Sequence, residues 1–262
     1  MSTPSGVPQA PVSAGGVEGQ AAVIGEVAKE MYSLRFDGSS YLSRTFGSGD
    51  RTSYSFSCWF KQSLQKSGGP SIFSAITGSN SNNNEEVIYL NSSGTLGFAN
   101  DGVGATRYAN IQDKIRDFSA WYHLTFVWNS NNPDQSKRLL FYLNGLEKTT
   151  EWNSGSGLNL SENSAKINTA INHYLGFNND SGNGTYYSGY LANIHFIDGE
   201  ALPPEATGEL ISDVWRPASY SGDYGVNGFH LDFDPDNMVY DSNGKLTQVK
   251  DASGNDNHWT AN

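Results

Sequence analysis

The sequence predicts an all-β protein built as an antiparallel two-sheet sandwich, and three observations support this fold class. Aromatic strand segments that end in Asn, Gly, Asp or Ser follow one another from residue 34 to residue 198. No helical segments alternate with these strands, so a parallel sheet is not expected. The 13% aromatic content and the 29 glycines suit short strands joined by tight turns.

An arm of low complexity precedes the strands. Residues 1–20 are rich in Pro, Ala, Gly, Ser and Val, a composition that cannot bury a core. Residues 21–31 have apolar residues at helical spacing, but a helix this short is marginal alone because its length does not repay nucleation. We therefore predict that residues 1–31 form an attachment arm that something outside the domain holds.

The main domain is predicted to span residues 32–205. Short strand segments that recur roughly every 8 to 12 residues, with turn residues between them, imply two packed sheets. The expected strands lie in residues 33–42, which contain a turn at Asp37-Gly38, and in residues 54–61, 71–76, 86–90, 95–99, 121–128, 138–143, 174–177 and 187–197. Residues 121–128 and 138–143 are joined by a polar loop and followed by Asn144-Gly145, so they are predicted to form a β-hairpin.

The single cysteine excludes a framework of internal disulfides. It is Cys58, and strand alternation places it on the same face as Tyr54 and Phe56. The sequence therefore predicts a thiol in the core of the sandwich.

Residues 206–262 are predicted to form a C-terminal extension packed on the sandwich, because they hold too few apolar residues for a core of their own. Pro203 and Pro204 indicate a short helical segment that reaches Ile211. Residues 227–233 are expected to form a strand with apolar side chains on one face.

The charge pattern narrows the classes of partner. The net charge is −11, and residues 199–262 carry 11 acids and 3 bases, or −8 of that total. No cluster of Lys and Arg is present, so nucleic acid is not expected as a partner. No stretch approaches the roughly 20 apolar residues of a membrane span, and the first residues do not form a secretory signal.

Several phrases resemble the laminin G-like, concanavalin A-like jelly-roll family. They are residues 34–42, 54–61, 121–124, 141–145 and 189–198, in the family's order. Three further phrases, residues 199–203, 220–229 and 251–260, resemble the version found in virion proteins of tailed bacteriophages. The first resemblance implies a jelly-roll sandwich over residues 32–205.

The second resemblance implies a peripheral structural protein of a tailed phage virion, such as a capsid decoration, a head or neck fibre, or a tail fibre. Such a protein is made in the host bacterial cytoplasm and ends on the virion surface. Residues 1–31 would contact other virion proteins, and the lectin-like domain would adhere to host or environmental glycans. Homo-oligomerisation is expected, with threefold assembly by analogy to fibres. The alternative is a free carbohydrate-binding lectin module that is not bound to a virion.

Enzymatic activity is not expected. Glucan-cleaving relatives resemble one another in a Glu-x-Asp-x-x-Glu strand that presents two carboxylates on one face, and this strand is absent here. Glu85 and Glu86 are adjacent, so they are predicted to point to opposite faces. A glycan hydrolase would need paired carboxylates in one cleft, which the sequence alone does not place.

No metal ligand is assigned and no cofactor is expected, although calcium is left open because many laminin G-like domains carry one ion. Residues 232–237 begin like a helix-loop-helix calcium loop, but Asn237 stands where that loop needs Gly. Residues 251–257 offer oxygens at alternate positions, although Asp and Asn also make ordinary turns. Ala192-Asn193 occupies the place where the family often has an acidic ligand.

Glycan binding by such folds commonly stacks a sugar on an exposed aromatic ring beside Asn or Asp. Trp152 and Tyr186 are the rim aromatics that fit, and Asn178 and Asp180 precede Tyr186 in the same loop. The alternative is that Trp152 caps the sandwich and Tyr186 begins a strand. These four residues are the predicted glycan site.

Overall fold

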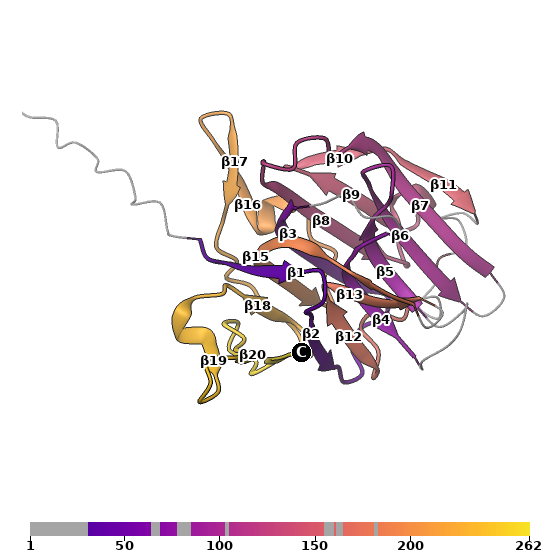
Figure 1. Ribbon diagram of the computed structural model, residues 1–262. Coiled ribbons are helices and arrows are strands. Elements are labelled where there is room, and N and C mark those ends of the chain that lie inside the picture. The colour runs from indigo at the N-terminus through magenta and orange to yellow at the C-terminus, as the bar shows by residue number, and fades with distance from the viewer. Residues whose placement is uncertain are drawn as a thin grey trace, which may run out of the picture. The chain divides into compact units, whose positions relative to one another are not determined.

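The computed structural model describes residues 31–63, 69–77, 85–102, 105–154, 160, 165–180 and 183–262. The predicted attachment arm therefore lies outside the described residues, except for Met31. Residues Met31–Asn262 form one compact unit. Its two large sheets are antiparallel and pack face to face, which confirms the predicted all-β sandwich (Figure 1).

One layer is a seven-stranded sheet in which the long strand β15 (Ser188–Asp198) pairs with three others. Along one side of β15 lie first β1 (Ser33–Asp37) and then β18 (Phe229–Leu231), and β3 lies along the other side. From there the sheet continues through β3 (Ser53–Gln62), β8 (Tyr122–Asn129), β9 (Leu139–Leu143) and β10 (Leu146–Lys148). The adjacent pair β8 and β9 confirms the predicted hairpin.

The other layer is a ten-stranded sheet. Its order is β11 (Thr150–Ser154), β7 (Ala105–Lys114), β6 (Thr95–Gly102), β5 (Glu85–Leu90), β4 (Ser71–Ile76), β12 (Asn172–Leu175), β2 (Leu42–Thr45), β21 (Trp259–Ala261), β20 (Leu246–Val249) and β19 (Met238–Tyr240). Two hairpins stand outside both layers: β13 (Phe177–Asp180) with β14 (Asn183–Tyr186), and β16 (Gly208–Ile211) with β17 (Val214–Pro217). The short 3₁₀ turns are η1 (Gln135–Lys137), η4 (Pro204–Ala206) and η5 (Pro235–Asn237).

Stacked aromatic rings join the two layers across the core. Phe56 of β3 stacks on Phe73 of β4 with ring centroids 4.7 Å apart, and Phe98 of β6 stacks on Phe126 of β8 at 5.2 Å. All four rings are fully buried, so they contribute both apolar area and preferred ring geometry. Cys58 is buried on the same face as Phe56, and burial raises the pKa of its thiol, which confirms the predicted core thiol.

The expected strand at residues 174–177 is divided at Gly176. This glycine has φ +81°, and a Cβ built on it would lie 2.5 Å from the Phe36 ring. Only glycine fits this conformation and this close approach. The chain therefore leaves the ten-stranded sheet after β12 and turns into the β13–β14 hairpin.

Two other expectations need correction. The helical segment predicted from Pro203 to Ile211 is a single 3₁₀ turn, η4, followed by strand β16. Strand β7 was not predicted, because among its described side chains only Ala109 and Ile111 are buried and apolar. In a strand with so few apolar side chains, the alternation of apolar and polar residues that predicts a strand is almost absent.

Residues 206–262 add strands to both layers. β18 extends the seven-stranded sheet beside β15, and β21 pairs with β2 in the ten-stranded sheet. Trp259 of β21 is fully buried and meets the rings of Phe46 and Phe229 edge-on, with centroids 6.1 and 5.0 Å away. The predicted strand with apolar side chains on one face is β18, where Phe229 and Leu231 are fully buried.

No helix among the described residues has the length and apolar character needed to cross a membrane.

Candidate functional site

The predicted glycan residues are divided between two places. Tyr186, Asn178 and Asp180 belong to the β13–β14 hairpin, whereas Trp152 belongs to the edge strand β11. Five strand spacings separate β11 from β12, which precedes the hairpin, or roughly 24 Å at the usual spacing. Trp152 pairs with buried Ala109 and packs against the core, so the structure does not bring it to Tyr186.

Asn178 anchors the hairpin to the ten-stranded sheet. Its side chain is buried, and Nδ2 donates to Oε2 of Glu85 at 2.8 Å. Beside it, Ser74 Oγ donates to the carbonyl of Phe177 at 2.7 Å. The side chain of Asp180 lies outside the described residues. The amide that sequence reasoning assigned to a sugar is therefore bonded within the protein.

Tyr186 lies in an aromatic group that we call the tyrosine cluster, formed by Tyr41, Tyr174, Phe177 and Tyr186. Phe177 stacks on Tyr41 with centroids 4.7 Å apart and lies 4.9 Å from Tyr186. Tyr174 lies 5.9 Å from Tyr41 and 5.3 Å from Phe177. All four side chains are half-buried, which leaves part of each ring accessible to solvent.

Strand alternation places the tyrosine cluster on the outer face of the ten-stranded sheet. Leu42 and Leu175 are register partners and are buried in the core. Tyr41 and Tyr174 precede these leucines by one residue, so they point away from the core. In the sequence, the alternation of Tyr41 with Leu42 is the pattern that indicates an outward-facing Tyr41. The contact of Phe177 with the tyrosines depends on the turn at Gly176 and has no such local pattern.

The phenol of Tyr41 is affected by its surroundings in the tyrosine cluster. Burial raises the pKa of the Tyr41 phenol, and the neighbouring phenols of Tyr174 and Tyr186 raise it further. A protonated phenol both donates and accepts hydrogen bonds. The cluster therefore presents ring faces and hydroxyl groups on one surface.

Two adjacent glutamates have different surroundings, as the sequence predicted. Glu86 is fully buried, and it accepts from Tyr54 Oη at 2.5 Å, Asn100 Nδ2 at 3.2 Å and the Ile167 amide at 3.2 Å. Burial raises the pKa of Glu86, and these donors oppose the shift. Glu85 instead contacts Asn178 on the outer face. The two carboxylates thus point to opposite faces and do not share a cleft.

The first calcium candidate, residues 232–237, forms a turn. Asp232 Oδ1 accepts from the Asp234 amide at 3.0 Å and from Asn237 Nδ2 at 2.9 Å. Asp234 in turn caps η5 by accepting from the Asp236 amide at 3.0 Å. These carboxylates serve as local caps.

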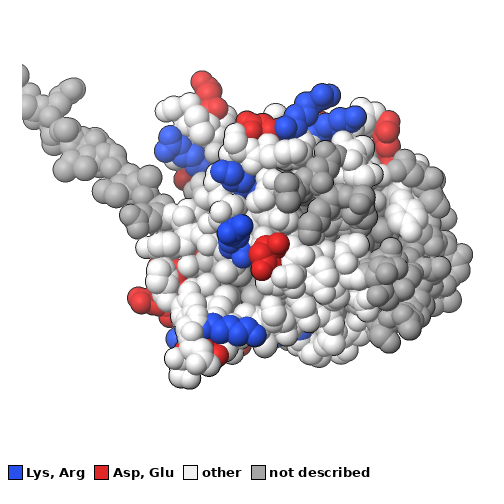
Figure 2. All heavy atoms as spheres, viewed as in Figure 1, with Lys and Arg blue, Asp and Glu red and all other residues white. Residues whose placement is uncertain are grey.

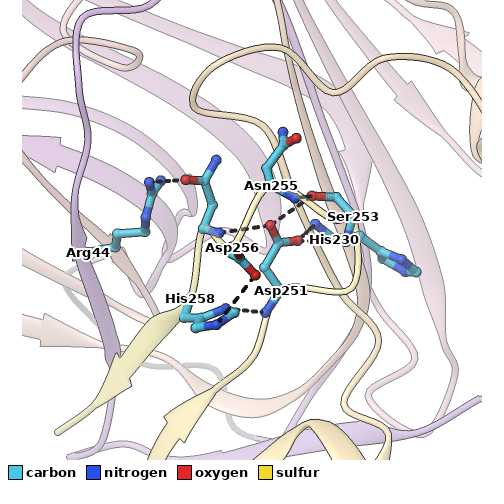
Figure 3. Close-up of polar contacts among 8 residues, drawn as sticks. Arg44, His230, Asp251, Ser253, Asn255, Asp256 and His258 are labelled. Atoms are coloured by element: carbon cyan, nitrogen blue, oxygen red, sulfur yellow. Dashed lines mark hydrogen bonds and ion pairs between the residues drawn. The ribbon is translucent and has the colours of Figure 1, made fainter.

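The second calcium candidate belongs to what we call the C-terminal clasp, residues 251–258 (Figure 3). The Asp251 carboxylate accepts from the amides of His230, Ser253 and Asn257 at 2.8, 2.8 and 3.0 Å, and from Ser253 Oγ at 2.7 Å. Both of its oxygens are therefore occupied by protein donors. The carboxylate joins the clasp to β18.

The rest of the C-terminal clasp binds the neighbouring backbone. Asn255 Nδ2 donates to the carbonyls of Gly225 and Gly228, and Asn257 Nδ2 also donates to Gly228, at 2.7 Å. Asn257 Oδ1 accepts from the Arg44 guanidinium on β2 (Figure 3). Within the described part of the chain, no three His, Cys, Asp or Glu side chains gather in a way that could hold a metal ion.

Solved structures share this fold at low sequence identity. A protein from Bacteroides ovatus described as carbohydrate binding aligns with TM-score 0.60 and 12% identity, over 89% of this chain and 58% of that one. An SAP-like pentraxin from Limulus polyphemus aligns with TM-score 0.45 and 22% identity, over 65% of this chain and 76% of that one. Tailspike protein 2 of an Escherichia coli bacteriophage aligns with TM-score 0.45 and 14% identity, over 67% of this chain and 23% of that one. The first alignment shows a common fold, and the other two are too loose to support an argument.

A search of curated proteins found no match to this chain. A family model described as the concanavalin A-like lectin/glucanases superfamily matches residues 36–206, which is more than half of the chain. This match covers the strands from β2 to β15. The chain therefore belongs to the concanavalin A-like lectin/glucanases superfamily, as a laminin G-like domain.

Proposed function

We propose that this chain is a lectin-like module that binds carbohydrate at the tyrosine cluster. The observation that carries the proposal is the set of four half-buried aromatic rings outside the core, with three phenol hydroxyl groups among them. Sugar rings offer C–H faces that pack on aromatic rings and hydroxyl groups that need polar partners. The tyrosine cluster offers both kinds of contact.

The charge distribution favours a neutral glycan. Only 16% of the residues are charged, and on the face shown in Figure 2 the acidic and basic side chains are interspersed among uncharged ones. The tyrosine cluster itself contains no Asp, Glu, Lys or Arg side chain. Recognition there would depend on ring stacking and hydroxyl contacts more than on charge.

A glycan array with the full chain, followed by titration calorimetry with the best ligand, tests this proposal. We expect Tyr174→Ala and Tyr186→Ala each to weaken binding about tenfold, because each removes one stacking ring. Tyr240→Ala is the matched control, since Tyr240 is an exposed tyrosine on β19, outside the cluster. An array with no ligand, or affinities that the cluster variants leave unchanged, would contradict the proposal. Adding Trp152→Ala tests the separate sequence-based candidate.

We propose further that the module is carried on the surface of a tailed phage virion, with residues 1–31 as the attachment segment. The support is the resemblance of residues 199–203, 220–229 and 251–260 to virion proteins, together with the Pro/Ala/Gly-rich composition of residues 1–20. Deleting residues 1–31 should remove the protein from purified virions while the remaining chain stays folded by circular dichroism. Unchanged incorporation would contradict this assignment and favour the free lectin.

A further inference from the structure

The β16–β17 hairpin carries apolar side chains that stay exposed among the described residues. It is a separate two-stranded sheet, and in the described part of the chain neither strand pairs with any third strand. Leu210, Ile211 and Val214 are 64%, 42% and 51% exposed. Figure 1 shows the hairpin extending away from both layers. Apolar side chains grouped on a projecting element are typical of an interaction surface.

Trp215 of β17 anchors the hairpin to the body of the protein. The indole Nε1–H donates to Nδ1 of buried His123 at 2.9 Å. Its ring lies so close to Gly145 and Gly208 that a Cβ on either glycine would approach it to 2.6 or 2.4 Å. The hairpin is therefore a preorganised element, which reduces the entropy lost when it binds a partner.

The strand register gives the hairpin two different faces. Trp215 points toward the body of the protein, so its neighbours in sequence point away from it. The outer hairpin face consists of two register pairs, Glu209 with Arg216 and Ile211 with Val214. All four of these residues are exposed. One pair thus places opposite charges across the two strands, and the other pair places two apolar side chains across them.

This arrangement is complementary to a second copy of itself. A twofold axis along the hairpin would place Glu209 of each copy against Arg216 of the other, and Ile211 against Val214. Such an isologous contact makes every interaction twice. Glu209 and Arg216 form no ion pair with each other, so both charges are available to the second copy.

We propose that two copies of this chain associate through the outer hairpin face, about a twofold axis along β16 and β17. The face is small, so the dimer is weak and concentration-dependent, as interfaces below about 1,200 Å² are. The proposal is independent of sugar binding, since the tyrosine cluster belongs to β12, the β13–β14 hairpin and the residue before β2, none of which pairs with β16 or β17.

Sedimentation velocity of the full chain over a wide concentration range tests the dimer. We expect Ile211→Asp to abolish association and Glu209→Arg to weaken it about tenfold or more, because two ion pairs become two like-charge contacts. The double variant Glu209→Arg/Arg216→Glu should restore the dissociation constant to within about threefold of the original, because the charges match again. Arg116→Glu, a reversal of an exposed charge outside β16 and β17, is the control.

A chain that remains monomeric at every concentration would overturn the proposal. A dimer or trimer with a dissociation constant that none of the hairpin variants changes would also overturn it, and a trimer would instead support the threefold assembly expected from the phage resemblance. Thermal unfolding of each variant ensures that lost association is not lost folding. Restoration by the double charge reversal is the result that a merely destabilised hairpin could not produce.

Discussion

His173 is fully buried, and its two ring nitrogens have partners that only the neutral imidazole satisfies. Nε2 accepts from the Asn168 amide at 3.1 Å, so the proton lies on Nδ1, which donates to the Ile171 carbonyl at 3.0 Å. The ring also stacks on Phe46 with centroids 3.7 Å apart. Burial is the main cause that lowers the pKa of His173 from 6.5 to about 3.

This shift makes the stability of the protein depend on pH. The folded-state pKa lies below that of the unfolded chain, so the unfolded chain binds the proton first as the pH falls. The contribution of His173 is complete above pH 6.5 and is lost as the pH falls toward 3. We expect the free energy of unfolding to fall by about 2 kcal/mol between pH 7 and pH 5 from this residue alone.

Urea unfolding of the original chain and of His173→Gln at pH 7, 6 and 5 measures this loss. Glutamine does not titrate, so the variant should lose about 2 kcal/mol less than the original chain over this range. His123 provides an internal reference, because burial lowers its pKa to about 3 as well and it is unchanged in both proteins. Equal pH dependence in the two proteins would mean that His173 carries a proton in the folded state.

At the residue scale, Tyr186 stood out in the sequence as an aromatic residue in an Asn- and Gly-rich segment, and its contact with a glycan stays a prediction. The partner of Asn178 could not be predicted, because the same segment pattern fits a sugar contact and a bond to Glu85 equally well. Only strand pairing, which brings residue 178 beside residue 85, decides between them. Side-chain partners that are distant in sequence leave no local signal.

At the element scale, two turns that are capped by an aspartate, Asp251 and Asp241, have different structural roles. Asp251 is buried and accepts four hydrogen bonds, three from within the C-terminal clasp and one from the His230 amide of β18. Asp241 is exposed and accepts from the amides of Asn243 and Lys245 within its own turn. The first turn connects separate elements, whereas the second connects only its own residues.

Substitution of these two aspartates should separate their contributions. We expect Asp251→Ala to lower the free energy of unfolding by about 2–4 kcal/mol, because it leaves the part-buried His230 amide and the buried Asn257 amide without acceptors. Asp241→Ala, the matched control, should cost about 1 kcal/mol or less. Urea unfolding measures both values. Equal losses would show that the C-terminal clasp contributes no more than an exposed turn.

The β16–β17 hairpin shows why some elements were not predictable. Its turn residues, Ser212 and Asp213, both have positive φ values of 49° and 63°, which are usually left to Gly or Asn. The two prolines before it indicated a helix. The anchoring bond from Trp215 to His123 joins residues 92 positions apart, so the local sequence carried no sign of it.

At the scale of the whole molecule, the C-terminal extension completes the core. Phe229, Leu231, Val249 and Trp259 are fully buried and belong to the same hydrophobic cluster as the strands of the sandwich. β21 also lies between β2 and β20 in the ten-stranded sheet. The predicted boundary at residue 205 therefore divides a continuous core.

A chain that ends after residue 205 should fail to fold cooperatively, because its core loses four large buried side chains at several kcal/mol each. A chain that begins at residue 31 should keep a cooperative transition, since Met31–Asn262 is one compact unit. Near-ultraviolet circular dichroism and thermal unfolding compare the two. A cooperative transition in the chain ended at residue 205 would show that the extension is dispensable.

The sequence by itself determined the fold class, the core strands and the inward direction of the Cys58 side chain. These features follow from turn residues and from the alternation of apolar and polar residues, which are local patterns. The family followed from short phrases along the same strands. The tertiary structure alone decided which aromatics meet in the tyrosine cluster, where Trp152 points and which carboxylates are already occupied. Those outcomes depend on pairing between strands far apart in the chain, and neither spacing nor composition records that pairing.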